Sequence, residues 1–188
     1  MPVGQNHSPE AIKQIIRDLY FLHLNPIQDI RVIINENDLF DFQVWIYGPT
    51  GTPYENGAFR VKLMFTSEFP HTPPDCKFLT KIFHPNISPS GEVCVNTLRC
   101  DWHPSLGVRH ILMMLRCLLI QPNPESALNE EAGNLLLENY EDYVQRARLI
   151  TEIHAYYRIY QEEGKSPRKR SSEMKERRVD KKRNLKPF

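Results

Sequence analysis

A cysteine at the end of an irregular stretch is the residue of this chain best placed to do chemistry. Cys94 lies eight residues after Asn86, with a Ser-Pro-Ser-Gly turn between them. A thiol can attack an acyl group, and an asparagine amide can donate to the oxyanion that forms in the attack. The spacing therefore indicates acyl transfer through Cys94, with Asn86 as a supporting donor.

The same residues also have structural interpretations. A free cysteine often packs as a small buried apolar residue, and an asparagine after a proline often ends a turn. His84 could take the proton of Cys94, but a histidine ahead of Pro85 can equally brace the loop, and we favour bracing. No Cys-His-Asn protease arrangement is evident, and the Cys94-x4-Arg99 spacing is one residue short of that of cysteine phosphatases.

The cysteines also bear on metals and disulfides. Cys76, Cys94, Cys100 and Cys117 form no Cys-x-x-Cys pair, which predicts free thiols rather than a disulfide framework. Cys100-x-x-His103 has no second pair to complete a zinc site, so we expect no metal. Cys117 lies among leucines and is predicted to belong to the core.

Composition limits where the protein can work. No apolar run approaches the roughly 20 residues that span a bilayer, and the first ten residues lack the pattern of a signal peptide. We therefore expect a soluble protein of the cytoplasm and nucleus that does not contact membranes.

Charge separates a body from a tail. The net charge is +1, but residues 165–188 hold 11 Lys/Arg and 3 Asp/Glu, which leaves −7 for the rest. We expect a catalytic domain over residues 1–163 and a basic, disordered interaction tail over residues 164–188. Because the tail lacks interleaved aromatic residues, specific nucleic-acid recognition is not expected.

Periodic patterns predict the elements that must position Cys94. A helix capped by Ser8 runs to near Asn25, and strands follow at residues 30–34, 42–46, 59–65 and 77–80. After an irregular segment, helices are predicted at residues 108–119, 129–137 and 140 to about 162. Short turns between the strands favour an antiparallel meander, and strands followed by helices indicate an α+β fold.

A set of motifs over about residues 8 to 155 resembles ubiquitin-conjugating enzymes, the E2 family. The motifs are Tyr47-Gly-Pro, Gly51-Thr-Pro-Tyr54, Gly57-Ala-Phe59, Phe69-Pro70, Pro73-Pro74, His84-Pro85-Asn86, Gly91-Glu-Val-Cys94 and Asp101-Trp102. The resemblance implies the ubiquitin-conjugating fold: an N-terminal helix, a four-stranded antiparallel sheet and C-terminal helices. It also implies that Cys94 accepts ubiquitin from an E1 as a thioester and passes it to a lysine with the help of an E3 ligase. No cofactor is implied, because ATP is consumed by the E1.

The resemblance assigns roles to residues around the thiol. Asn86 would stabilise the oxyanion or brace the active-site loop. His84, Pro85 and Asp101 would support that loop. Ser126 stands where most E2s carry an aspartate near the path of the acceptor lysine.

Longer runs are similar to the S-type E2 branch, which elongates chains through the eleventh-position lysine of ubiquitin with the anaphase-promoting complex. These runs are Phe78-Leu-Thr-Lys-Ile-Phe-His-Pro-Asn86, Asn123-Pro-Glu-Ser-Ala-Leu-Asn-Glu-Glu-Ala-Gly133, Leu135-Leu-Leu-Glu-Asn-Tyr140, Arg146-Ala-Arg148 and Thr151-Glu-Ile-His154. By matching position, Glu130 would orient or deprotonate the acceptor lysine, although a glutamate also suits the first turn of a helix. The chain departs from the branch at Arg99, where a lysine is usual, and at its end, Asn184-Leu-Lys-Pro-Phe188.

Two other functions stay open. The chain could be a non-catalytic scaffold that binds ubiquitin or a ligase, or an E2 for another ubiquitin-like modifier. Thioester formation separates the first alternative from an active E2, and panels of E1 enzymes and modifiers separate the second.

Overall fold

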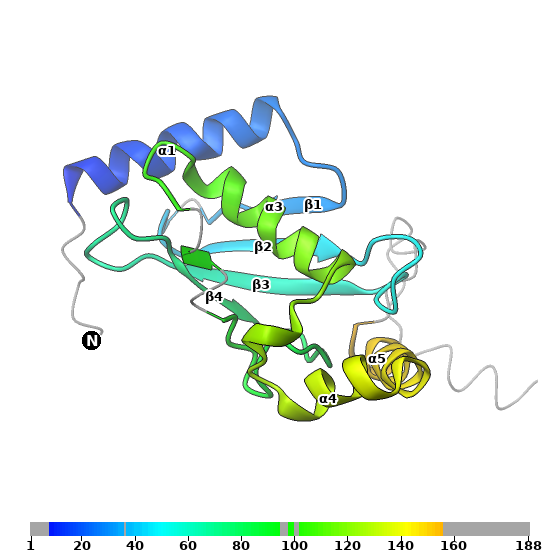
Figure 1. Cartoon of the computed structure of the whole chain (residues 1–188). Helices are drawn as coiled ribbons and strands as arrows, with labels where there is room; N and C mark the ends of the chain where they lie inside the picture. Colours follow the sequence, from blue (N-terminus) through cyan, green and yellow to red (C-terminus); the bar gives the residue numbers. More distant parts are fainter. Residues whose placement is uncertain (1–7, 36, 95–97, 100–101, 156–188) are drawn as a thin grey trace, which may run out of the picture. The chain divides into compact units, whose positions relative to one another are not determined.

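A computed structural model describes residues 8–35, 37–94, 98–99 and 102–155 (Figure 1). The elements are α1 (Pro9–Leu24), β1 (Ile30–Ile33), β2 (Phe42–Tyr47), β3 (Ala58–Met64), β4 (Asp75–Phe78), α3 (Gly107–Ile120), the short 3-10 turn η1 (Pro124–Ser126), α4 (Glu130–Glu138) and α5 (Tyr140–His154). This order confirms the predicted α+β fold. In the described part of the chain, no helix has the length and apolarity needed to cross a membrane.

The four strands form one antiparallel meander in the order β1-β2-β3-β4, as predicted. Phe42, Val44 and Ile46 of β2 are buried and alternate with more exposed neighbours, so one face of the sheet carries the core. The predicted position of β4 is wrong by two residues. Its pairing with β3 begins at Met64 and Asp75, and it ends where the chain turns out of the ladder, after Phe78.

Helices α1 and α3 pack on each other and contribute to the core that lies against the buried face of the sheet. The Ser8 hydroxyl accepts from the Ala11 amide at 3.1 Å, which caps α1 as the sequence predicted. Val108 and Leu115 of α3 are fully buried. The helix pair therefore fixes the α3 backbone relative to the sheet.

A carboxylate from α1 caps the beginning of α3. The amide of Val108 donates to Asp18 Oδ2 at 2.9 Å, and burial raises the pKa of Asp18. Gly107 has φ +65°, and a Cβ there would lie 2.6 Å from Asp18 Oδ1. Glycine is therefore needed both for the backbone angle and for the close approach of the carboxylate.

Cys117 is exposed, not buried, because the core side of α3 is taken by its neighbours Leu115, Leu118 and Leu119. Helix α5 ends at His154, and the rest of its predicted length lies outside the described residues. The basic tail at residues 164–188 lies outside them as well, so the proposed domain boundary stays a prediction.

Candidate active site

The cysteine lies on a segment that strand β4 holds in place. The Val93 amide donates to the Cys76 carbonyl of β4 at 3.0 Å, and Phe78 donates to the Gly91 carbonyl at 2.7 Å. Gly91 has φ +91°, and a Cβ there would lie 2.1 Å from the Phe78 carbonyl oxygen, so the segment can approach β4 only with glycine at this position. The glycine of the Ser-Pro-Ser-Gly turn therefore sets the path that leads to Cys94.

Cys94 itself is 7% exposed and contacts the loop that the sequence singled out. Its amide donates to the Asn86 carbonyl at 3.0 Å. The cysteine thus lies largely buried beside this loop. Cys76 is also buried, and desolvation raises the pKa of its thiol far above the ordinary range, so it is a poor nucleophile.

His84 is fully buried and uses both ring nitrogens. Nδ1 accepts from the Asn86 amide at 3.0 Å, so the proton must reside on Nε2, which donates to the Leu118 carbonyl of α3 at 2.9 Å. Burial lowers the pKa of this histidine to about 4. A neutral ring with no free nitrogen cannot take a proton from Cys94, and these contacts favour the bracing role.

The Asn86 side chain is fully buried and bonds to the segment after α3. Its Nδ2 donates to the carbonyls of Asn123 at 2.6 Å and Ser126 at 3.0 Å, and its Oδ1 accepts from the Asn123 amide at 2.9 Å. Both amide hydrogens are therefore used by main-chain oxygens. In this arrangement Asn86 joins two segments and has no hydrogen left for an oxyanion.

The carbonyl of Pro85 extends the connection toward α4. It accepts from the amides of Leu128 at 2.8 Å and Asn129 at 3.0 Å. The Asn129 side chain in turn accepts from the Ala132 amide at 3.2 Å and caps α4, whose first residue is Glu130. Glu130 is exposed and begins a helix, where the dipole favours its negative charge.

The structure thus brings most of the predicted site residues to one place. His84, Pro85 and Asn86 form the loop, Cys94 contacts it on one side, and Ser126 and the start of α4 contact it on the other. Asp101 lies outside the described residues. In the described part of the chain, no group of three His, Cys, Asp or Glu residues is placed to hold a metal.

One part of the site was missed from the sequence. The hydroxyl of Tyr54 lies 2.9 Å from the Phe83 carbonyl and 2.7 Å from the hydroxyl of Tyr143 on α5, and all three residues are buried. In the helical pattern of the sequence, Tyr143 is simply one of the apolar positions of its helix. Since 89 residues separate the two tyrosines, no local pattern could reveal the pair.

Comparison with known proteins identifies the family. A model of the family described as ubiquitin-conjugating enzyme matches residues 14–151. The chain belongs to the ubiquitin-conjugating enzyme family. It is therefore an E2, an enzyme that carries ubiquitin as a cysteine thioester and works with ubiquitin, an E1 and an E3 ligase.

Individual relatives support the S-type branch of the E2 family, as predicted. The ubiquitin-conjugating enzyme E2 S of Drosophila virilis is 58% identical over 151 residues, which cover 80% of this chain and 73% of that protein. The E2 S of Drosophila erecta is 59% identical over 151 residues, which cover 80% and 72%. A crystal structure from Plasmodium yoelii, assigned as a ubiquitin conjugating enzyme, has a TM-score of 0.73 at 31% identity and covers 81% of this chain and 99% of that one.

Proposed function

We propose that Cys94 is the cysteine of this E2 that carries ubiquitin, and that the enzyme extends ubiquitin chains. The position of one loop supports this proposal. Asn86 of the loop contacts Cys94, whereas Pro85 of the same loop contacts the segment that leads to Glu130. A thiol that holds the donor and a carboxylate that can meet an acceptor lysine therefore flank the same backbone. The 58% identity to E2 S proteins supports the lysine-eleven linkage and an anaphase-promoting-complex-type ligase as partner.

The proposed reaction has two acyl transfers. In loading, the Cys94 thiolate attacks the thioester carbonyl of ubiquitin on the E1, a new C–S bond forms, and the E1 cysteine leaves as a thiolate. In discharge, the amine of the acceptor lysine attacks the same carbonyl, an amide bond forms, and Cys94 leaves. The ATP that drives the sequence is consumed by the E1, so this chain needs no cofactor of its own.

Glu130 is proposed to prepare the acceptor lysine. Near neutral pH a free lysine amine, with a pKa of about 10.4, is protonated and cannot attack. An exposed carboxylate at the start of α4 can pair with the ammonium group, orient it and accept its proton as the amine approaches the thioester. Ser126 is proposed to line the path between them, since its carbonyl is held by Asn86 at 3.0 Å.

Asn86 is proposed to brace the loop rather than to donate to the oxyanion. Both hydrogens of its amide already bond to carbonyl oxygens that are 37 and 40 residues away in sequence. Donation to an oxyanion would require one of these buried bonds to break, which leaves a carbonyl without a partner.

We also propose that the enzyme works in the cytoplasm and nucleus, which imaging of the tagged full chain would test.

Thioester formation tests the proposal directly. The chain is incubated with E1, ATP and ubiquitin and run on a gel with and without reductant. A reductant-sensitive band, shifted by one ubiquitin, is expected for the wild type and for Cys117→Ala, and it should be absent in Cys94→Ala. Cys117 is the matched control because it is the exposed free cysteine of the described residues.

The remaining outcomes separate the alternatives. Cys94→Ser should give a reductant-resistant oxyester or no adduct, and a reductant-sensitive adduct in this variant would assign the nucleophile to another cysteine. No band in the wild type would indicate a scaffold or a different modifier, which other E1 and modifier pairs distinguish. Ubiquitin variants with a single lysine then test the linkage.

A further inference from the structure

Two adjacent glutamates, Glu130 and Glu131, begin α4, and they differ in their contacts. Glu131 forms an ion pair with Arg146 of α5, with a side-chain hydrogen bond between the same groups. Within the part of the chain that the structure describes, the Glu130 carboxylate forms no ion pair and accepts no hydrogen bond. Both carboxylates stand in the first turn of α4, near the same loop. Arg146 therefore neutralises the charge of Glu131, whereas the Glu130 carboxylate stays available to a positively charged group.

Arg146 also contacts the active-site loop. Its guanidinium carbon lies 4.9 Å from the centre of the Phe83 ring, at a distance that allows a cation–π contact. Phe83 is buried and directly precedes His84. One side chain of α5 thus connects the first turn of α4 with the loop that ends at Cys94.

Other contacts hold Phe83 in the position where it meets Arg146. Its carbonyl accepts from the Tyr54 hydroxyl at 2.9 Å, and its ring centre lies 6.2 Å from that of Tyr143. Tyr143 stands one helical turn before Arg146, so both residues of α5 meet the same phenylalanine. The position of Arg146 is therefore defined by a packed ring as well as by a charge.

We infer that Arg146 is a positioning residue that keeps Glu131 away from the acceptor lysine, so that Glu130 alone receives the ammonium group. The inference rests on the proposed role of Glu130. Two open carboxylates side by side would offer a lysine two places to bind, and only one of them can place the amine for attack on the Cys94 thioester. Arginine suits the task because its planar group can stack on an aromatic ring and bond to a carboxylate at the same time.

The test measures discharge of a preformed thioester on the full-length protein, over a series of acceptor ubiquitin concentrations. Because a second, non-productive place to bind lowers both quantities together, Arg146→Ala is expected to lower the maximal rate and the half-saturating concentration by the same factor, about two- to fivefold, the range that an exposed ion pair supports. Arg148→Ala is the matched control, since Arg148 is an exposed arginine of the same helix. Hydroxylamine needs no carboxylate to become reactive, so its discharge rate should stay normal in both variants.

A second substitution separates positioning from simple structural support. If an open Glu131 causes the loss, Glu131→Gln in the Arg146→Ala background should restore at least half of the lost rate. The inference is overturned if the double variant stays as slow as Arg146→Ala, if Arg146→Ala equals Arg148→Ala, or if hydroxylamine discharge falls as well. A normal rate in Glu130→Ala would instead refute the proposed role of Glu130, and a normal thioester in Cys94→Ala would refute the proposed nucleophile.

Discussion

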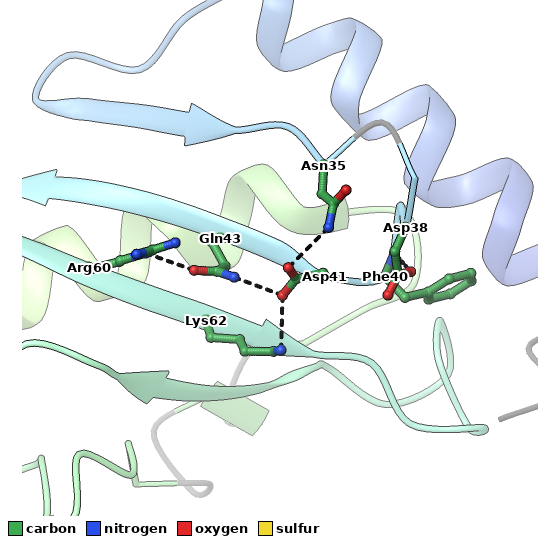
Figure 2. Close-up of polar contacts among 7 residues, drawn as sticks. All are labelled: Asn35, Asp38, Phe40, Asp41, Gln43, Arg60 and Lys62. Carbon is green, nitrogen blue, oxygen red and sulfur yellow. Dashed lines mark hydrogen bonds and ion pairs between the residues drawn. The ribbon is translucent and has the colours of Figure 1, made fainter. Parts of the chain in front are cut away.

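The loop at Pro85 and a polar cluster around Asp41 at the start of β2 are both rich in hydrogen bonds, yet they are built in opposite ways. At the loop, the buried side chains of His84 and Asn86 bond to main-chain carbonyls of distant segments. Around Asp41, side chains bond to other side chains near the surface (Figure 2). The bonds at the Pro85 loop fix the positions of distant segments relative to one another. The bonds around Asp41 instead link strands β2 and β3, which are already paired in the sheet.

The Asp41 cluster is a small charged network. Asp41 accepts from Lys62 at 2.9 Å, from Gln43 at 2.8 Å and from Asn35 at 3.2 Å, and Gln43 in turn accepts from Arg60 at 2.8 Å (Figure 2). Lys62 and Gln43 lie opposite each other in the β2–β3 ladder. The Lys62 side chain is 38% exposed, so water and salt weaken its pairing with Asp41.

From this comparison we expect burial, rather than charge, to determine the cost of losing a polar group in each region. The carbonyls that Asn86 binds are partly buried, so one that loses its donor is poorly placed to bond to water, and each such loss costs about 1–3 kcal/mol. The Asp41 side chain is 26% exposed, so water can solvate its carboxylate when a partner is lost. We therefore expect neutral substitutions at the loop to outweigh charge-removing substitutions at the cluster.

The largest effect is expected for Asn86→Ala. This change leaves the partly buried carbonyls of Asn123 and Ser126 without their donor, and the free energy of unfolding should fall by about 3 kcal/mol. Urea unfolding measures the loss, with Asn35→Ala in the Asp41 cluster as the control. Similar losses in the two variants would contradict the comparison.

The same variant tests how Asn86 contributes to catalysis. Discharge to lysine should slow more than loading, because the segment that leads to Glu130 loses its bonds to the Asn86 side chain and keeps those to the Pro85 carbonyl. Single-turnover assays of the two steps measure this difference. Equal slowing of loading and discharge would argue against a role in transfer.

Protonation of His84 at low pH is expected to lower the free energy of unfolding by an amount similar to that for Asn86→Ala. The folded protein holds the pKa of this histidine at about 4, below its ordinary value of 6.5, so the unfolded chain binds a proton at a higher pH than the folded one. The stabilisation is complete above pH 6.5 and is lost as the pH falls toward 4, by on the order of 3 kcal/mol. Unfolding midpoints across this range should show the slope for the wild type and a much flatter one for His84→Gln. An equal slope in both proteins would assign the effect to another group.

The smallest effect is expected for Asp41→Asn. Hydrogen bonds from Lys62 and Gln43 lower the pKa of Asp41 to about 2, from an ordinary value of 3.8, so its contribution is present above pH 3.8 and lost as the pH falls through 2. After screening by water, the variant should lose less than about 1 kcal/mol at pH 7. Unfolding at low and high salt measures it, and a loss that is large or independent of salt would contradict an exposed network.

The sequence by itself determined the local features of this protein. Ser8 and Asn129 cap helices with their own side chains over three residues, and the apolar alternation of β2 needs only neighbouring positions. Such signals act over a few residues, so they can be interpreted without the fold. The family motifs likewise lie in short runs, and they predicted the fold and the E2 family correctly.

Only the tertiary structure decided which groups meet. The limits of β4 depend on its register with β3, and the exposure of Cys117 depends on which side of α3 faces the core. The sequence offered Asn86 as an oxyanion donor or a brace, and its partners Asn123 and Ser126, 37 and 40 residues away, favour the brace. The contact of Arg146 with Phe83 and Glu131 is equally non-local. No short pattern encodes these contacts, because they form only when the packed core brings distant segments within hydrogen-bond range.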